Sequence, residues 1–63
     1  MHEDLGRRLR DHRERLNLSQ RELAQRLGVS VRAIQTWESG KAIPLPRHRR
    51  LLERFMSTER IEL

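Results

Sequence analysis

Apolar residues recur along the chain at helical spacings, and polar or turn-forming residues divide them into four groups. Leu5 and Leu9 begin the first group, which predicts a helix over residues 5–16. Asp4 is placed to cap the start of this helix. Asn17 can end it, because asparagine tolerates the left-handed backbone conformation that a helix C-terminus often needs.

A second helix is predicted to begin at Gln20, next to a capping box made by Ser19 and Glu22. In such a box each side chain accepts a hydrogen bond from a backbone amide that the first turn leaves unpaired. Gly28 ends the helix, since glycine readily adopts the left-handed conformation. The apolar face of this helix consists of Leu23, Ala24 and Leu27.

A third helix is predicted over residues 31–39, directly after the short turn that Gly28 begins. Ser30 caps its start, and Gly40 ends it by the same left-handed device. Two short helices joined so tightly must cross steeply. The segment 19–39 is therefore predicted to be a helix-turn-helix.

The segment 43–46, with the sequence IPLP, is predicted to be an extended connector, because a proline pushes the residue before it out of the helical region. Pro46 can then open a fourth helix, where its missing amide hydrogen costs nothing. Residues 57–63 have no assigned structure and can fray. The expected fold is all-α, with four to five short helices in one domain over residues 1–63. The apolar face of the fourth helix consists of Leu51, Leu52, Phe55 and Met56.

The third helix carries a polar stripe that contains no acidic residue. Its members lie at i, i+3, i+4 and i+7, and they are Arg32, Gln35, Thr36 and Ser39. The opposite face is apolar and includes Ile34 and Trp37, so that Trp37 is expected to be a core anchor. The polar stripe is therefore expected to face outward, toward a partner.

Arg13 and Glu38 both fall on apolar helix faces, where an unpaired charge is costly. Arg13 lies one turn beyond Leu9, and Glu38 lies one turn beyond Ile34. We therefore expect the two side chains to form an ion pair that ties the first helix to the end of the third. Such a pair holds orientation more than it adds stability, although loss of one partner typically costs about 3–5 kcal/mol.

Composition narrows the possible functions. The 63 residues include 14 Lys or Arg against 9 Asp or Glu, and the formal net charge of +5 favours a polyanionic partner such as nucleic acid. There is no cysteine, and the three histidines are too widely spaced for a metal triad, so that no metal and no other cofactor is expected. No nucleophile, base and orienting group can be assembled, and an enzyme is not expected. Without a membrane span or a signal peptide in the sequence, we expect a cytoplasmic protein.

The stretch LSQRELAQRLGVSVRAIQTWESGK resembles the helix-turn-helix of the Xre family, the phage repressor and Cro-like DNA-binding domains. The resemblance covers about residues 5–55 and includes Arg13, which stands six residues before Ser19. The matching residues of the entry and turn are Leu18, Ser19, Gln20, Leu23, Ala24, Leu27, Gly28, Val29 and Ser30. The matching residues of the exit are Ile34, Trp37, Glu38, Gly40 and Lys41.

This resemblance implies a lambda-repressor-like fold whose third helix lies in the major groove of DNA. It also implies that Gln20, Ser39 and Lys41 contact backbone phosphates, and it supports the pairing of Arg13 with Glu38. His12 stands where relatives usually carry an aliphatic residue, and we expect a partly buried histidine with one hydrogen bond. The residues that the resemblance places at base edges are Ser30, Val31, Arg32, Gln35 and Thr36.

Side-chain chemistry gives these residues specific roles at DNA. Arg32 can donate to O6 and N7 of guanine, with phosphate contact as an open alternative, and Gln35 can pair with N6 and N7 of adenine. Val31 and Thr36 offer methyl groups to thymine. Phosphate contacts, which make binding fall with salt, are expected from Gln20, Arg21, Ser39 and Lys41. Residues 47–50 are expected to be a solvated helix start, with contact to flanking DNA as the alternative.

The expected function is that of a sequence-specific transcriptional regulator, a repressor, that binds double-stranded DNA. The alternative is a protein-interaction module, such as an antitoxin that holds a small protein partner. RNA binding is disfavoured because the aromatic residues Trp37 and Phe55 lie on apolar faces and form no stacking platform. A homodimer on two half-sites is expected. Its candidate contacts are Leu52, Phe55, Met56, Ile61 and Leu63, with core packing as the alternative for the first three.

Overall fold

The computed structural model describes residues 5–58, which form four helices and no strand. The helices are α1 (Leu5–Arg15), α2 (Gln20–Leu27), α3 (Val31–Ser39) and α4 (Pro46–Thr58). The expected all-α fold is therefore confirmed, with four helices in the described part of the chain. Because α4 extends to Thr58, only residues 59–63 of the expected tail lie outside the described residues.

The boundaries of α2 and α3 follow from local capping interactions. Ser19 Oγ accepts a hydrogen bond from the backbone amide of Glu22 at 3.0 Å, and the Glu22 carboxylate accepts one from the Ser19 amide at 2.7 Å. Gly28 and Gly40 end α2 and α3 with positive φ angles of 74° and 80°. Asn17, just after α1, also has a positive φ of 59°. These turns have the conformations that the sequence predicted, and they bring α2 and α3 together in a helix-turn-helix.

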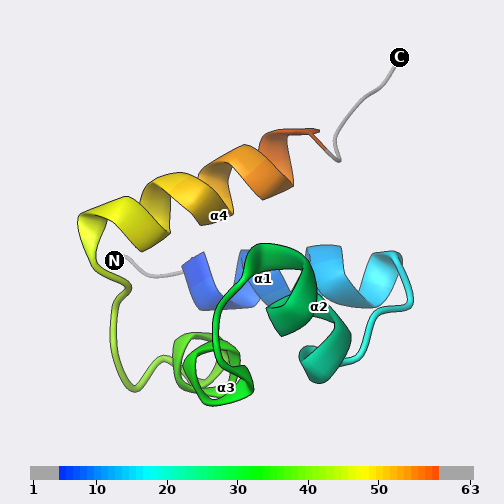
Figure 1. Ribbon diagram of the computed structural model, residues 1–63, viewed down its shortest axis with the longest axis horizontal. Helices are drawn as coiled ribbons and strands as arrows, with labels where there is room; N and C mark the ends of the chain where they lie inside the picture. Colours follow the sequence, from blue (N-terminus) through cyan, green and yellow to red (C-terminus); the bar gives the residue numbers. More distant parts are fainter. Residues whose placement is uncertain (1–4, 59–63) are drawn as a thin grey trace.

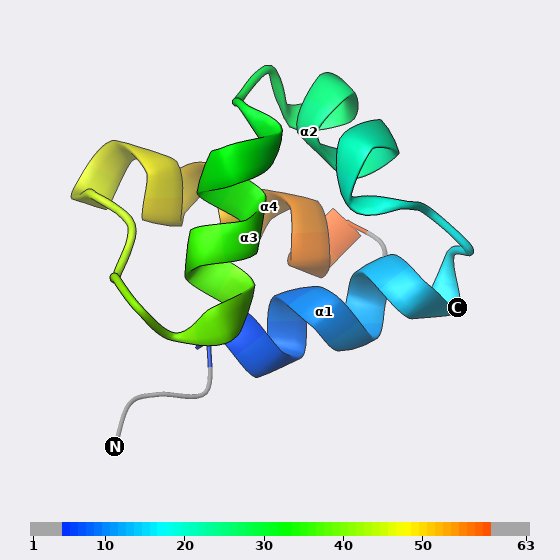
Figure 2. The ribbon, with the colours of Figure 1, turned by 90° about the horizontal axis from the view of Figure 1, so that it is seen from below.

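α1 lies between α3 and α4, and α2 packs against α3. Figure 1 shows α4 along one side of the molecule and α3 on the opposite side, with α1 between them. α3 packs against both α1 and α2, and α1 packs against α4. In Figure 2 the axis of α3 runs across that of α1, and α3 lies nearest to the viewer while α4 lies behind. One long side of α3 therefore faces away from the body of the protein.

The core is formed by the apolar faces of all four helices. Trp37 is 7% exposed, and its ring lies 5.4 Å from the ring of His48 in α4, measured between centroids. Trp37 thus links α3 to the first turns of α4. The buried core residues are Leu9, Leu23, Ala24, Ile34, Trp37, Leu52, Phe55 and Met56.

Three of the expected dimer contacts belong to this core. Leu52, Phe55 and Met56 are at most 8% exposed, so they serve in core packing and offer no surface to a second copy. The other two, Ile61 and Leu63, lie outside the described residues. For Leu52, Phe55 and Met56 the structure therefore confirms core packing, the alternative to a dimer contact that the sequence offered.

The connector between α3 and α4 is not helical over residues 43–45. Pro44 is buried, whereas Ile43 is 70% exposed and Leu45 is 59% exposed. The connector is therefore held against the body of the protein at its middle residue while the neighbouring apolar side chains face solvent.

None of the four described helices is long and apolar enough to cross a membrane. Within residues 5–58 there is also no group of three or more His, Cys, Asp or Glu side chains that could hold a metal ion.

Candidate nucleic-acid interface

The outer side of α3 carries the polar stripe. Arg32, Gln35 and Ser39 are exposed, and Thr36 is half-buried. On the inner side of the same helix Ile34 is fully buried and Trp37 is nearly so. No carboxylate lies on the outer stripe, and one acidic residue in α3, Glu38, is turned toward α1 and α2. The exposed side of α3 can therefore approach a polyanion without meeting a negative charge of its own.

Ser30, at the start of α3, caps the helix and also lies next to the polar stripe. Ser30 Oγ accepts a hydrogen bond from the backbone amide of Ala33 at 3.1 Å and caps the helix. This contact leaves the hydroxyl hydrogen of Ser30 for another acceptor. Val31 is half-buried and packs against the core, so that only part of its side chain is open to a partner.

Arg13 of α1 and Glu38 of α3 form an ion pair that joins the two helices. Arg13 Nε donates to Glu38 Oε2 at 2.7 Å, and Arg13 Nη2 donates to Glu38 Oε1 at 3.0 Å. Arg13 Nη1 also donates to the backbone carbonyl of Leu18 at 2.9 Å, which ties the turn before α2 to the same pair. The side chains are 12% and 4% exposed, respectively. The guanidinium fork of arginine suits such two-point contact with a carboxylate.

The environment of this pair favours the charged form of Arg13. The hydrogen bonds with Glu38 raise the pKa of Arg13, while burial of the guanidinium acts in the opposite direction. The attraction between the two opposite charges adds to the rise. Arg13 therefore remains charged although it is largely shielded from water, and its hydrogen bonds to Glu38 hold the end of α3 against α1.

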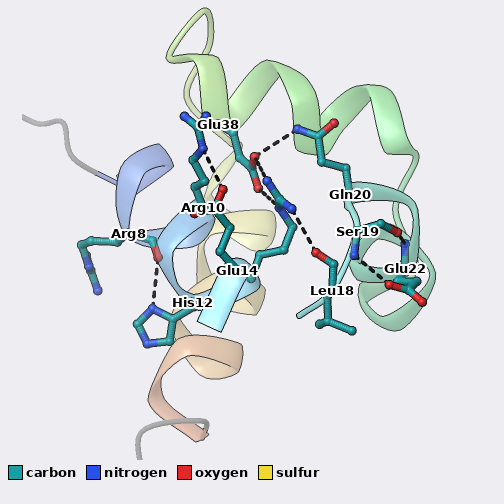
Figure 3. A network of polar contacts seen from close by, with 10 residues as sticks. Arg8, Arg10, His12, Glu14, Leu18, Ser19, Gln20, Glu22 and Glu38 are labelled. Atoms are coloured by element: carbon teal, nitrogen blue, oxygen red, sulfur yellow. Dashed lines mark hydrogen bonds and ion pairs between the residues drawn. The ribbon is translucent and has the colours of Figure 1, made fainter. Parts of the chain in front are cut away.

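Gln20, at the start of α2, belongs to the same cluster. Its side-chain nitrogen Nε2 donates to Glu38 Oε1 at 3.0 Å (Figure 3). An amide nitrogen carries two hydrogens, so one remains for an outside acceptor such as a phosphate. Glu38 thus fixes the direction in which Gln20 presents this second hydrogen. Arg21, the next residue, is exposed.

Ser39 and Lys41 lie where α3 ends. Ser39 Oγ donates to the backbone carbonyl of Thr36 at 3.0 Å and accepts from the Lys41 backbone amide at 3.4 Å. The hydroxyl hydrogen of Ser39 is therefore already engaged within the helix end. Lys41 is exposed and can offer its ammonium group to an anion.

Sequence reasoning missed Gly6 in α1. A Cβ atom at this position would collide with the backbone carbonyl oxygen of Trp37 and would lie 3.2 Å from its carbonyl carbon. α1 and α3 can therefore approach each other closely only because residue 6 has no side chain. The signal in the sequence was a glycine inside a helical pattern, which often marks a close approach of two backbones.

His12 takes no part in the α3 surface. It is half-buried, and its Nδ1 lies 3.0 Å from the backbone carbonyl of Arg8 in the same helix. It lines a surface depression between α1 and α4 together with Arg8, Glu53, Met56 and Ser57. His12 is thus a partly buried histidine with one intrahelical partner, as the sequence suggested.

A family model described as a helix-turn-helix domain matches residues 4–58 of this chain. The match covers all four helices and every residue of the cluster around Glu38. No curated protein and no solved structure matches the chain. The chain belongs to the helix-turn-helix domain family, and this membership indicates a DNA-binding regulator, a class that is typically not enzymatic.

Proposed function

We propose that this protein is a sequence-specific transcriptional regulator, a repressor of the Xre type, that reads double-stranded DNA with the outer side of α3. One observation carries the proposal. Gln35 and Arg32 are exposed on a stripe without carboxylates, while Trp37 locks the opposite side of the helix into the core. A helix held in this way can enter the major groove with its reading side chains already outward.

Base recognition follows from the planar side chains on this stripe. Gln35 matches the donor and acceptor pattern of adenine, and Arg32 matches the two acceptors of guanine. Thr36 and Val31 can place methyl groups against thymine. Ser30 can add its free hydroxyl hydrogen at the N-terminal end of α3, where repressors of this class commonly contact bases.

Phosphate contacts are assigned to the residues on either side of α3. Gln20 has one amide hydrogen left after its bond to Glu38, and the N-terminus of α2 adds a partial positive charge beside it. Arg21 and Lys41 supply full charges from exposed positions. These contacts position the domain on the duplex, while the α3 stripe supplies the sequence preference.

One such domain covers only a few base pairs, so regulation requires two copies on two half-sites about one helical turn apart. We therefore propose that the protein acts as a homodimer at its operator. The operator, in this view, is a pseudo-palindrome, because two copies related by a two-fold axis read the same half-site in opposite directions.

Selection of bound duplexes from a random pool tests the proposal. We expect an enriched motif in inverted repeat, and an affinity for it that falls steeply as salt rises, with a log–log slope of about −0.9 per phosphate neutralised. Enrichment of no motif, together with a flat salt response, would reject DNA recognition. Recovery of a small protein partner in place of a DNA motif would favour an interaction module instead.

A further inference from the structure

The connector between α3 and α4 presents an apolar surface that the fold itself does not use. Building on the proposed function, we propose that Ile43 and Leu45 form the contact through which two copies of this chain pair when both are bound to one DNA duplex. The contact is too small to hold two copies together in the absence of DNA.

Ile43 and Leu45 are the large apolar side chains that are exposed in residues 5–58. They are 70% and 59% exposed, whereas Leu52 and Phe55, once candidates for a dimer contact, are 0% and 8% exposed. In the described part of the chain, the apolar side chains most open to a second copy are therefore those of the connector.

The connector holds these two side chains in place before any contact is made. Each of the two residues precedes a proline, which restricts its backbone to extended conformations. Pro44, between them, is buried and anchors the segment to the body of the protein. Neighbouring residues of an extended chain point to opposite sides, so Ile43 and Leu45 share the outward side. Little conformational freedom is lost when such a preordered surface is covered.

Charge and area fit a second copy that is held in place by DNA. The net charge of +5 makes free copies repel each other, and the phosphates of a shared duplex remove this repulsion. Two apolar side chains from each copy cover far less than the about 1,200–2,000 Å² that stable interfaces bury. A weak contact of this kind becomes effective when a common template raises the local concentration of the second copy to the millimolar range.

The position of the connector fits this role. It begins directly after α3 ends and leads away from the reading helix to α4 (Figure 2). It therefore lies at one end of the helix that we place in the groove, where a copy on the adjacent half-site can approach. Copies related by a two-fold axis present the same residues to each other, so Ile43 and Leu45 of one copy would meet the same pair of the other.

The test compares a duplex carrying one selected half-site with duplexes carrying two inverted half-sites at spacings around one helical turn. For the wild-type protein we expect cooperative binding at one spacing. The second copy should bind at least about 5-fold more tightly than the first, which is the lower end of the usual coupling between two binding sites. The variant I43S/L45S is expected to bind the single half-site with wild-type affinity and to lose the cooperativity. A control, D11A/R15A, alters exposed residues of α1 without changing the net charge and should keep it.

Circular dichroism spectra should show that both variants fold, because all four substituted side chains are exposed. Cooperativity that persists in I43S/L45S, or that is absent from the wild-type protein at every spacing, would overturn this inference alone. A drop in the affinity of I43S/L45S for the single half-site would also overturn it, since the side chains would then contact DNA. Failure of the wild-type protein to bind any duplex would instead reject the proposed function, and this inference with it.

Discussion

Gly6 in the first turn of α1 lies directly against the backbone of Trp37 near the end of α3. A Cβ atom at Gly6 would collide with the Trp37 carbonyl oxygen and would come within 3.3 Å of Cα of Glu38. This close approach of two helices brings Arg13, about two turns further along α1, within reach of Glu38. A residue with no side chain thus sets the distance across which the buried ion pair forms.

Replacement of Gly6 by alanine is expected to destabilise the protein. In most helices this change stabilises by about 0.5–1 kcal/mol, but overpacking against a rigid backbone typically costs about 1–3 kcal/mol. Urea unfolding followed by circular dichroism measures the difference. R7A, which alters the exposed neighbouring residue, should change the free energy of unfolding by less than about 0.5 kcal/mol. A G6A variant as stable as the wild-type protein would show that α1 and α3 are not in such close contact.

The variant R13M should lose much of its stability, because the buried carboxyl group of Glu38 would lose its cationic partner. Breaking a buried pair from one side costs about 3–5 kcal/mol, a large part of the total for a domain of this size. The double variant R13M/E38L removes both charges and should recover most of the loss. Thermal unfolding of the single and double variants measures the coupling. An R13M variant that melts at the wild-type temperature would contradict the role assigned to the pair.

The variant Q35A is expected to weaken binding to the selected operator by about 1–3 kcal/mol, because a two-point contact with adenine is lost. Binding to an unrelated duplex should not change, since Gln35 carries no charge. Titration of both duplexes under the same salt conditions separates the two effects. An equal loss on both duplexes would assign Gln35 to the phosphate backbone instead.

Lys41 and Gln20 should affect the salt dependence of binding differently. K41Q removes a charge and is expected to reduce the log–log slope by about 0.9, because one fewer counterion is released. Q20A removes a neutral donor, so it should lower the affinity and leave the slope unchanged. R15Q removes the same charge as K41Q from the side of α1 opposite Arg13, and it should not change the slope. Equal slopes for K41Q and the wild-type protein would exclude Lys41 as a phosphate contact.

S39A is expected to affect DNA binding less than K41Q does. The hydroxyl hydrogen of Ser39 is already donated to the carbonyl of Thr36, so it is not free to bind a phosphate. Affinity measurements for the two variants on the same operator test this ranking. A loss in S39A as large as that in K41Q would mean that the hydroxyl leaves Thr36 when DNA binds.

Much of the fold could be predicted from the sequence because it depends on neighbouring residues. Ser19 caps α2 through Glu22, three residues away, and Gly28 and Gly40 end helices through their own backbone angles. The apolar face of α3 follows from helical periodicity, since residues three or four apart share one side of a helix. Such interactions are complete within a few residues and require no knowledge of which helices pack together.

The cluster around Glu38 could be predicted only in part. A charge on an apolar face must be paired, and this principle linked Arg13 to Glu38 across 25 residues. The third member, Gln20, gave no such signal, because a glutamine at the start of a helix is ordinary on a solvated surface. Its bond to Glu38 depends on where α2 lies relative to α3.

By itself the sequence determined where α2 and α3 begin and end, which sides of the helices are apolar, and that the outer stripe of α3 carries no acid. Tertiary structure alone decided that Gly6 touches the Trp37 backbone, that Phe55 is buried and that Ile43 is exposed. The physical reason lies in the range of the interactions. Periodicity and capping act within a few residues, whereas burial depends on which helix faces are covered once distant segments have packed.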